Sequence, residues 1–219
     1  MLMYFKSRVD AGVRLAEQLM QYRYENTVVV ALDRGGVRIG YQIAANLHCT
    51  LNELLCEPIM IEGENLQYAT VMQGGVVAKN PSLSEEQQDF YYGEFLGQIN
   101  DATREATTRI NRMLGDGGDL DPKILRDHIV ILVSDGMENG SVLEAAVEFL
   151  KPIRVAKVVV TTPIASVEAV DKMHILADEL HVLGVTPNYI NTAHYYETDD
   201  MPTGDETKML INHTILGWQ

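Results

Sequence analysis

The chain is poor in cysteine and in basic residues, and it contains no long apolar run. Only two of its 219 residues are cysteines, Cys49 and Cys56, too few for a disulfide framework. Both lie in an apolar segment, so we expect buried, reduced thiols. No apolar run approaches the length of a membrane-spanning helix, and the start MLMYFKSRVD lacks a signal-peptide core. We therefore expect a cytoplasmic protein without a membrane partner.

Basic residues are strongly outnumbered by acidic ones. The chain has 17 Lys and Arg against 31 Asp and Glu, which gives a formal net charge of −14. A protein that binds nucleic acid displaces counterions with a basic stripe, and none is present, so we expect no nucleic-acid partner. This balance is compatible with a local anion pocket, because backbone N–H groups do not enter the charge count.

What the chain does have is a regular alternation of buried strands and amphipathic helices. Apolar runs predict strands at 27–32, within 50–61, and at 129–134, 155–161 and 179–183. Helical spacing predicts helices at 10–22, after 36 to about 47, and at 82–114, 141–150 and 166–174. Such alternation is typical of the α/β class with a doubly wound, mostly parallel sheet flanked by helices.

We expect one domain over residues 1–219, with a core at about 8–185 and a small cap or tail at about 186–219. The tail is read either as a cap over the sheet edge or as a solvated terminus. Gly74 and Gly75, between apolar flanks at 68–77, predict a hairpin or a mobile excursion. The long helix at 82–114 begins with two overlapping capping-box patterns, at 82–85 and 84–87.

The most informative stretch is 129–142, IVILVSDGMENGSV. A buried strand ends at Ser134 and Asp135, a glycine-bearing loop follows, and a helix begins at Ser141. Such a loop can direct several backbone N–H groups at one anion, and open α/β sheets bind ligands at this carboxyl edge. The pattern therefore predicts a site for a phosphorylated molecule, with Asp135 beside it.

The layout resembles that of the type I phosphoribosyltransferases. The stretch ALDRGGV at 31–37 is similar to the family's pyrophosphate loop, which reads Leu-Pro-Arg-Gly-Gly-Val in the closest relatives. HIVILVSDGMENGS at 128–141 follows the long helix, as the family's ribose-phosphate motif does. The ending matches as well, with Ala-Asp-Glu at 177–179 before a strand and two tyrosines at 195–196.

The resemblance implies binding of phosphoribosyl pyrophosphate or a nucleoside monophosphate, with Mg²⁺ held through the substrate. Asp135 and Glu138 would be the catalytic acids. The pyrophosphate would be bound by Asp33, Arg34, Gly35 and Gly36. The ribose and 5′-phosphate would be bound by Ser134, Asp135, Gly136, Met137, Glu138, Asn139, Gly140, Ser141 and Val142. Since family members are often dimers, the resemblance also implies a homodimer.

Three positions depart from the family motif of two acids followed by Thr-Gly-x-Thr. Ser134 stands at the first acid, Asn139 at the first threonine and Val142 at the last. In the family both acids grip the ribose hydroxyls, and an acceptor of that kind commonly contributes about 2–4 kcal/mol to transition-state stabilisation. On this interpretation, Ser134→Asp would strengthen ribose affinity or rescue activity.

Three interpretations stay open. The first is a phosphoribosyltransferase-like enzyme that transfers the phosphoribosyl group to a nitrogen base and releases pyrophosphate. The second is a catalytically impaired sensor or scaffold with the same fold. The third is an unrelated nucleotide-binding protein, which the absence of Gly-x-Gly-x-x-Gly after the first strand disfavours.

Each candidate residue also has a plain structural alternative. Asp135 could only cap the next turn, residues 33–36 could form an ordinary βα turn, and Glu138 could be a solvated carboxylate. Tyr195 and Tyr196 could stack on a nucleobase within a cap or simply pack. The aromatic residues between 90 and 95 are read as packing at helical spacing.

Overall fold

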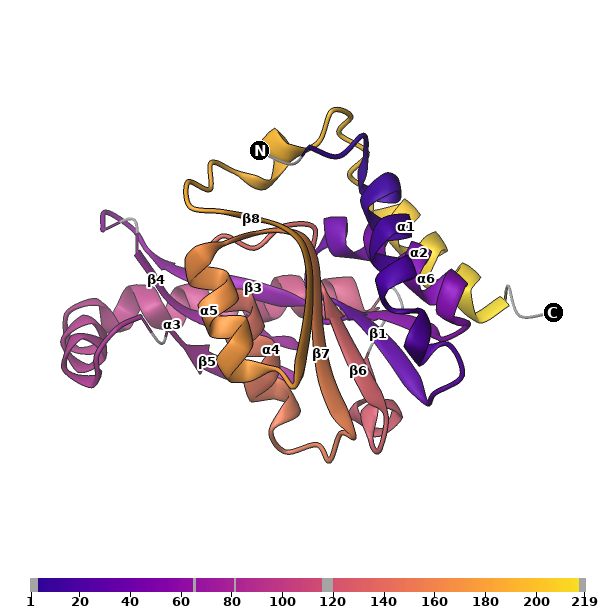
Figure 1. Ribbon diagram of the computed structural model, residues 1–219. Helices are drawn as coiled ribbons and strands as arrows, with labels where there is room; N and C mark the ends of the chain where they lie inside the picture. Colours follow the sequence, from indigo (N-terminus) through magenta and orange to yellow (C-terminus); the bar gives the residue numbers. More distant parts are fainter. Residues whose placement is uncertain (1–3, 65, 81, 116–119, 217–219) are drawn as a thin grey trace.

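A five-stranded parallel sheet forms the centre of the protein (Figure 1). The computed structural model describes residues 4–64, 66–80, 82–115 and 120–216. The strand order is β2-β1-β6-β7-β8, and every neighbouring pair is parallel. The strands are β1 (Thr27–Ala31), β2 (Thr50–Glu53), β6 (Ile129–Val133), β7 (Lys157–Ser166) and β8 (Glu179–Thr186). The predicted α/β class with a mostly parallel sheet is confirmed.

Helices cover both faces of this sheet (Figure 1). On one face lie α1 (Arg8–Gln18) and α2 (Arg34–Leu47), and on the other lie α4 (Ser141–Leu150) and α5 (Val167–Leu176). The first face is formed by Val29, Ala31, Ile131 and Val133. The second face is formed by Val28, Val30, Val130 and Leu132. Burial on both faces explains why the strands are apolar without alternation.

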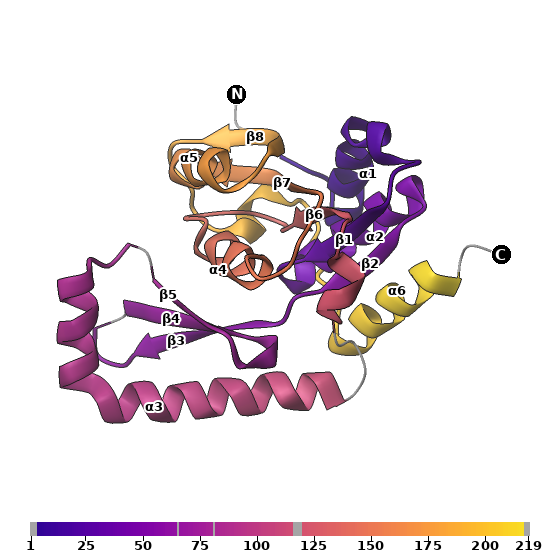
Figure 2. The same cartoon turned by 90° about the horizontal axis from the view of Figure 1, so that it is seen from below.

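A second, antiparallel sheet of three strands lies beside the first and packs on the long helix α3 (Figure 2). Its order is β3-β4-β5, and a short turn at Gln73–Gly75 joins the last two strands. Gly74 and Gly75 have φ of +77° and +76°, which favours glycine, so the hairpin is confirmed. The elements are β3 (Cys56–Ile61), β4 (Leu66–Met72), β5 (Val77–Lys79) and α3 (Glu85–Gly115).

Two local predictions are refined by the structure. The segment 50–61 is two strands in two sheets, because buried Leu54 packs into the main core where the chain leaves β2. Helix α3 starts at Glu85 through the second capping box. The backbone N–H of Ser84 donates to Gln87 Oε1 at 2.9 Å, and that of Gln87 donates to Ser84 Oγ at 3.2 Å.

The segment after β8 forms a cap rather than a solvated terminus. A turn at Thr192–Tyr195 buries Tyr195 and Tyr196, and the Phe5 N–H donates to the Tyr195 carbonyl at 2.9 Å. The chain then forms α6 (Gly204–Leu216), a helix that the sequence did not predict and that packs against α2 and β2. Among the described helices, none has the length and apolarity needed to cross a bilayer.

A polar cluster of Tyr22, Lys157 and Glu179 lies at the amino end of the main sheet. Tyr22 belongs to the short 3₁₀ turn Met20–Tyr22 that precedes β1. The Tyr22 hydroxyl donates to Glu179 Oε2 at 2.7 Å, and the Lys157 ammonium forms an ion pair with the same carboxylate. Hydrogen bonds from Lys157 and then Tyr22 lower the pKa of Glu179 to about 2. Another 3₁₀ turn, Pro122–Leu125, precedes β6.

This cluster predicts a pH-dependent contribution to stability. The folded-state pKa of Glu179 lies below the unfolded value of about 4.3, so the contribution is complete above about pH 5 and is lost as the pH falls toward 2. Urea unfolding of wild type and Glu179→Gln should therefore differ at pH 7, and the difference should shrink as the pH falls toward 2. Glu17→Gln, an exposed change on α1, is the control. A difference that is equal at both pH values would contradict this reading.

A pair of helix glycines predicts opposite effects of the same substitution. A Cβ on Gly12 of α1 would lie 2.9 Å from the Ile39 carbonyl oxygen of α2, whereas a Cβ on exposed Gly97 of α3 would meet nothing within 4 Å. Gly12→Ala should lower the free energy of unfolding by about 1–3 kcal/mol through overpacking. Gly97→Ala should raise it by about 0.5–1 kcal/mol through helix propensity. Denaturant titration of both variants checks the contrast, which fails if they shift the same way.

Candidate functional site

The carboxyl ends of β1 and β6 lie side by side, with Ala31 opposite Val133. The chain leaves β1 through Asp33 into α2, and it leaves β6 through Ser134 and Asp135 toward α4. The two loops that the sequence singled out therefore meet at one edge of the sheet. In open α/β sheets this edge is the usual place for a ligand.

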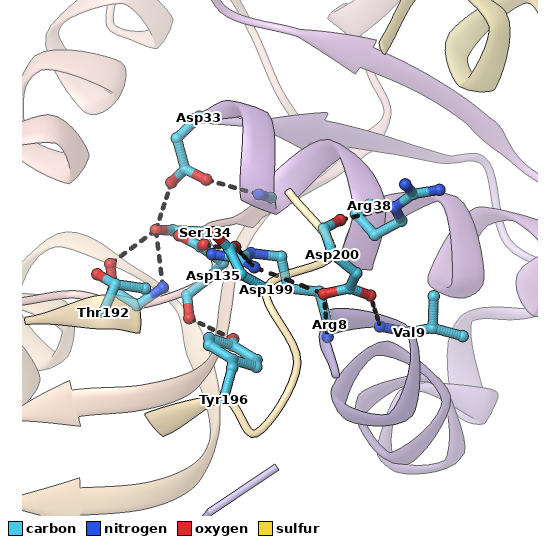
Figure 3. A network of polar contacts seen from close by, with 12 residues as sticks. Arg8, Val9, Asp33, Arg38, Ser134, Asp135, Thr192, Tyr196, Asp199 and Asp200 are labelled. Atoms are coloured by element: carbon cyan, nitrogen blue, oxygen red, sulfur yellow. Dashed lines mark hydrogen bonds and ion pairs between the residues drawn. The ribbon is translucent and has the colours of Figure 1, made fainter. Parts of the chain in front are cut away.

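Asp33 begins α2 and joins the two loops. Its carboxylate accepts a hydrogen bond from the Gly36 N–H at 2.5 Å and one from the Ser134 hydroxyl at 2.5 Å (Figure 3). Arg34, Gly35 and Gly36 are thus the first turn of a capped helix rather than a separate loop. The Gly36 N–H is already used by Asp33, so it is not free to bind a diphosphate.

The two glycines allow the loops to touch. A Cβ on Gly35 would lie 2.0 Å from Asp135 Oδ2, and a Cβ on Gly36 would lie 2.6 Å from the Val133 carbonyl oxygen. No side chain fits at either position without displacing the β6 loop. Arg34, in contrast, is exposed, and its guanidinium is free to face a ligand.

Asp135 points inward, to a buried arginine that the sequence did not reveal. Arg8, 1% exposed, donates from Nε to Asp135 Oδ2 at 2.7 Å and from Nη1 to Asp199 at 2.8 Å (Figure 3). Its backbone N–H donates to Asp200 at 2.9 Å. The Tyr196 hydroxyl donates to the Asp135 carbonyl at 2.6 Å, and its ring lies 4.6 Å from the Arg8 guanidinium carbon.

Burial decides the protonation of this network. Burial, and then the charge of Asp33, raises the pKa of Asp135, while Arg8 opposes the shift. Burial also raises the pKa of Asp33, and the hydrogen bonds from Ser134 and Gly36 oppose it. Burial alone would lower the pKa of Arg8, but its carboxylate partners outweigh that effect and raise it. Asp135 is therefore held in place by a cation inside the protein, and it is only 5% exposed.

Part of the loop after Asp135 is hydrogen-bonded to β7. The Met137 N–H donates to the Ile164 carbonyl at 3.0 Å, and its carbonyl accepts from the Ser166 N–H at 2.9 Å. Met137 therefore has no free amide for an anion. Glu138 and Asn139 are exposed, and the Ser141 N–H donates to Asn139 Oδ1 at 3.0 Å.

Helix α4 starts at Gly140, whose φ is +71°, and no side chain caps it. Unpaired N–H groups of a helix start carry a partial positive charge and can bind an anion. Val142, in the first turn of α4, is the residue of the predicted 5′-phosphate loop that lines the cavity described next.

A cavity of about 390 Å³ lies between the carboxyl edge of the main sheet and the small sheet. Asp33, Arg34 and Val142 line it from the two predicted loops, and Glu53 lines it from the end of β2. The small sheet contributes Glu57, Pro58, Gln67 and Thr70. A neighbouring cavity of about 270 Å³ shares Arg34 and Glu53 and continues toward α6.

The groups in this cleft suit a ligand that carries both anionic and hydroxyl groups. Arg34 supplies a guanidinium, which grips two oxygens of a phosphate or diphosphate. Burial raises the pKa of Glu53, and the positive charge of Arg34 opposes that shift. Burial also raises the pKa of the Cys56 thiol to about 12, so Cys56 is not a thiolate nucleophile at neutral pH.

The structure brings some predicted residues into the cleft and leaves others outside it. Asp33, Arg34 and Val142 line it, whereas buried Asp135 and bonded Met137 do not. The alternative that Tyr195 and Tyr196 stack on a base is wrong, because both rings are buried. The sequence analysis did not identify Arg8, Asp199 and Asp200. Arg8 was marked only as a charged residue at the start of an apolar helix, and Asp199 and Asp200 only as an acidic pair far along the chain.

Comparison with known proteins identifies the family. The sequence profile described as "Phosphoribosyl transferase domain" matches residues 5–181. A Mycobacterium tuberculosis protein named "Putative phosphoribosyl transferase Rv0571c" is 26% identical over 215 residues, which are 95% of this chain and 46% of that protein. The chain thus spans about half the length of the curated relatives it matches.

The solved structures show the same fold. The crystal structure of TT1426 from Thermus thermophilus has a TM-score of 0.73 at 24% identity and covers 95% of this chain and 98% of its own. The matching profile extends over most of the chain, from before α1 into β8, and it includes both loops of the cleft. The chain belongs to the phosphoribosyl transferase domain family.

Proposed function

We propose that the cleft binds phosphoribosyl pyrophosphate with Mg²⁺ and that the protein transfers the phosphoribosyl group to a nitrogen base. The observation that carries this proposal is the cavity of about 390 Å³ lined by Arg34 from one predicted loop and Val142 from the other. Arg34 and the first turn of α4 both border this space, which suits a sugar with a phosphate at one end and a diphosphate at the other. Nucleoside monophosphate, the product of such a transfer, would fit the same cleft.

The diphosphate would lie against Arg34. This side chain is exposed on the cleft, and its guanidinium makes no hydrogen bond or ion pair with the residues that the structure describes. The 5′-phosphate would lie at the start of α4, where Gly140 provides no side-chain cap and Asn139 accepts a hydrogen bond from the Ser141 N–H alone. Glu138 is exposed on the loop before it and would add an unfavourable charge near that phosphate.

Magnesium fits the oxygen-rich side of the cleft. Glu53 lines the cavity beside Arg34, and carboxylate oxygens are ligands that Mg²⁺ prefers. Bound Mg²⁺ would neutralise charge on the diphosphate and would take most of its ligands from the substrate and from water. No group of three or more His, Cys, Asp or Glu suited to a metal occurs among the described residues.

Catalysis would come mainly from positioning and electrostatics. Arg34 would hold the departing diphosphate, and the α4 start would hold the 5′-phosphate, so that the anomeric carbon is fixed between them. A carboxylate beside the ribose would stabilise the positive charge that develops on the sugar as the diphosphate leaves. The bond from the anomeric carbon to the diphosphate breaks, and a bond to a nitrogen of the base forms.

A second candidate is a protein that binds the same ligand without turnover. The observation that favours it is the ion pair from Arg8 to Asp135, which leaves the retained acid of the motif 5% exposed. A sensor needs the phosphate contacts of the cleft but not the carboxylate at the anomeric carbon.

We further propose a homodimer formed through α3. Tyr91 and Phe95 of this helix pack against the core of the small sheet as predicted, whereas Phe90 and Tyr92 are 62% and 49% exposed. Light scattering should give twice the chain mass for wild type and the single chain mass for a Phe90→Ser/Tyr92→Ser variant. A monomeric wild type would exclude this arrangement.

The function is tested by mixing the protein with phosphoribosyl pyrophosphate, Mg²⁺ and a panel of purines and pyrimidines. Pyrophosphate release with any base supports the transferase, calorimetric binding without release supports the sensor, and no binding defeats both. Arg34→Ala should weaken phosphoribosyl pyrophosphate about 10- to 100-fold, as expected for a lost charge-assisted contact. Arg104→Ala, an exposed arginine of α3, should leave the affinity unchanged.

A further inference from the structure

Two carboxylates, Asp33 and Asp135, lie next to each other at the carboxyl edge of the sheet. Asp135 is 5% exposed, is bound to Arg8, and does not line the cleft. Asp33 is half-buried and lines the cleft together with Arg34. A ligand in the cleft therefore meets the carboxylate that comes from the end of β1, not the one that follows β6.

The Ser134 hydroxyl orients the Asp33 carboxylate. Its hydroxyl lies 2.5 Å from Asp33 Oδ2 and 2.9 Å from the Gly136 carbonyl, and it has only one proton to donate. The shorter bond to the charged acceptor is the stronger of the two. At 4% exposure, Ser134 has no surface left for a ligand.

We propose that Asp33 is the carboxylate that this protein presents to the ribose hydroxyls of its ligand, and that Ser134 is the positioning residue that holds it. The proposal rests on the proposed function. Each oxygen of Asp33 accepts one protein hydrogen bond, from Gly36 and from Ser134, and Asp135 lies against the same carboxylate. The two adjacent oxygens of a carboxylate suit the two adjacent hydroxyls of a ribose.

The arrangement also explains why a serine occupies position 134. A carboxylate there would stand within hydrogen-bonding distance of Asp33, and both would be partly buried beside Asp135. Like charges this close repel, and one of them must keep a proton. The sequence-based expectation that Ser134→Asp strengthens ribose affinity therefore changes: alone it should weaken binding, and it should help only when Asp33 is made neutral.

The test is calorimetric titration with ribose 5-phosphate and with 2-deoxyribose 5-phosphate, both without metal. Asp33→Asn removes the charge and keeps the helix cap, because asparagine caps helices as well as aspartate does. It should weaken ribose 5-phosphate about 10- to 100-fold and reduce the preference over the deoxy sugar. Asp33→Ser, a second capping residue, should behave alike, and circular dichroism confirms that both variants fold.

Moving the carboxylate from position 33 to position 134 gives a second, more specific test. Ser134→Asp alone should bind ribose 5-phosphate more weakly than wild type, and Asp33→Asn/Ser134→Asp should bind it more tightly than Asp33→Asn. If folded Asp33→Asn binds ribose 5-phosphate as tightly as wild type does and keeps the preference over the deoxy sugar, the inference is overturned and the proposed function still stands. If the wild type binds neither ribose 5-phosphate nor phosphoribosyl pyrophosphate, both proposals fall.

Discussion

The buried guanidinium of Arg8 is the interaction on which the functional edge of this protein depends. It connects the start of α1, the loop after β6 and the acidic segment at Asp199 and Asp200. A buried charge without partners is costly, so these three segments are stable only together. Tyr196 completes the enclosure with its ring on the guanidinium and its hydroxyl on the Asp135 carbonyl. The cap is therefore held over the sheet edge by ion pairs as well as by apolar burial.

This constraint divides the acids of the edge between two tasks. Asp135 neutralises Arg8 and maintains the architecture, while Asp33 caps α2 and faces the cleft. The glycines at 35 and 36 make the division possible, since any side chain there would separate the two loops. The family fold thus keeps a cleft at this edge even though one acid of its motif is turned into the protein.

The parallel sheet and its two loops were predictable because their signals are local. Apolar runs mark the strands, and the capping box at Ser84 and Gln87 marks a helix start within four residues. The role of Arg8 was not predictable, since its partners lie 127 and 191 residues away along the chain. Helix α6 was not predicted from the sequence because few apolar residues, Leu210 and Ile211 among them, connect it to the core.

The pairing between Phe5 and the Tyr195–Glu197 segment joins parts of the chain made at opposite times during synthesis. Arg8 emerges from the ribosome early, but two of its carboxylates emerge only with residues 199 and 200. Until those residues are made, the Arg8 guanidinium lacks two of its carboxylate partners, although domains generally begin to fold from the amino-terminal side. A chain cut before residue 199 would therefore leave Arg8 with Asp135 as its one remaining carboxylate partner among the described residues.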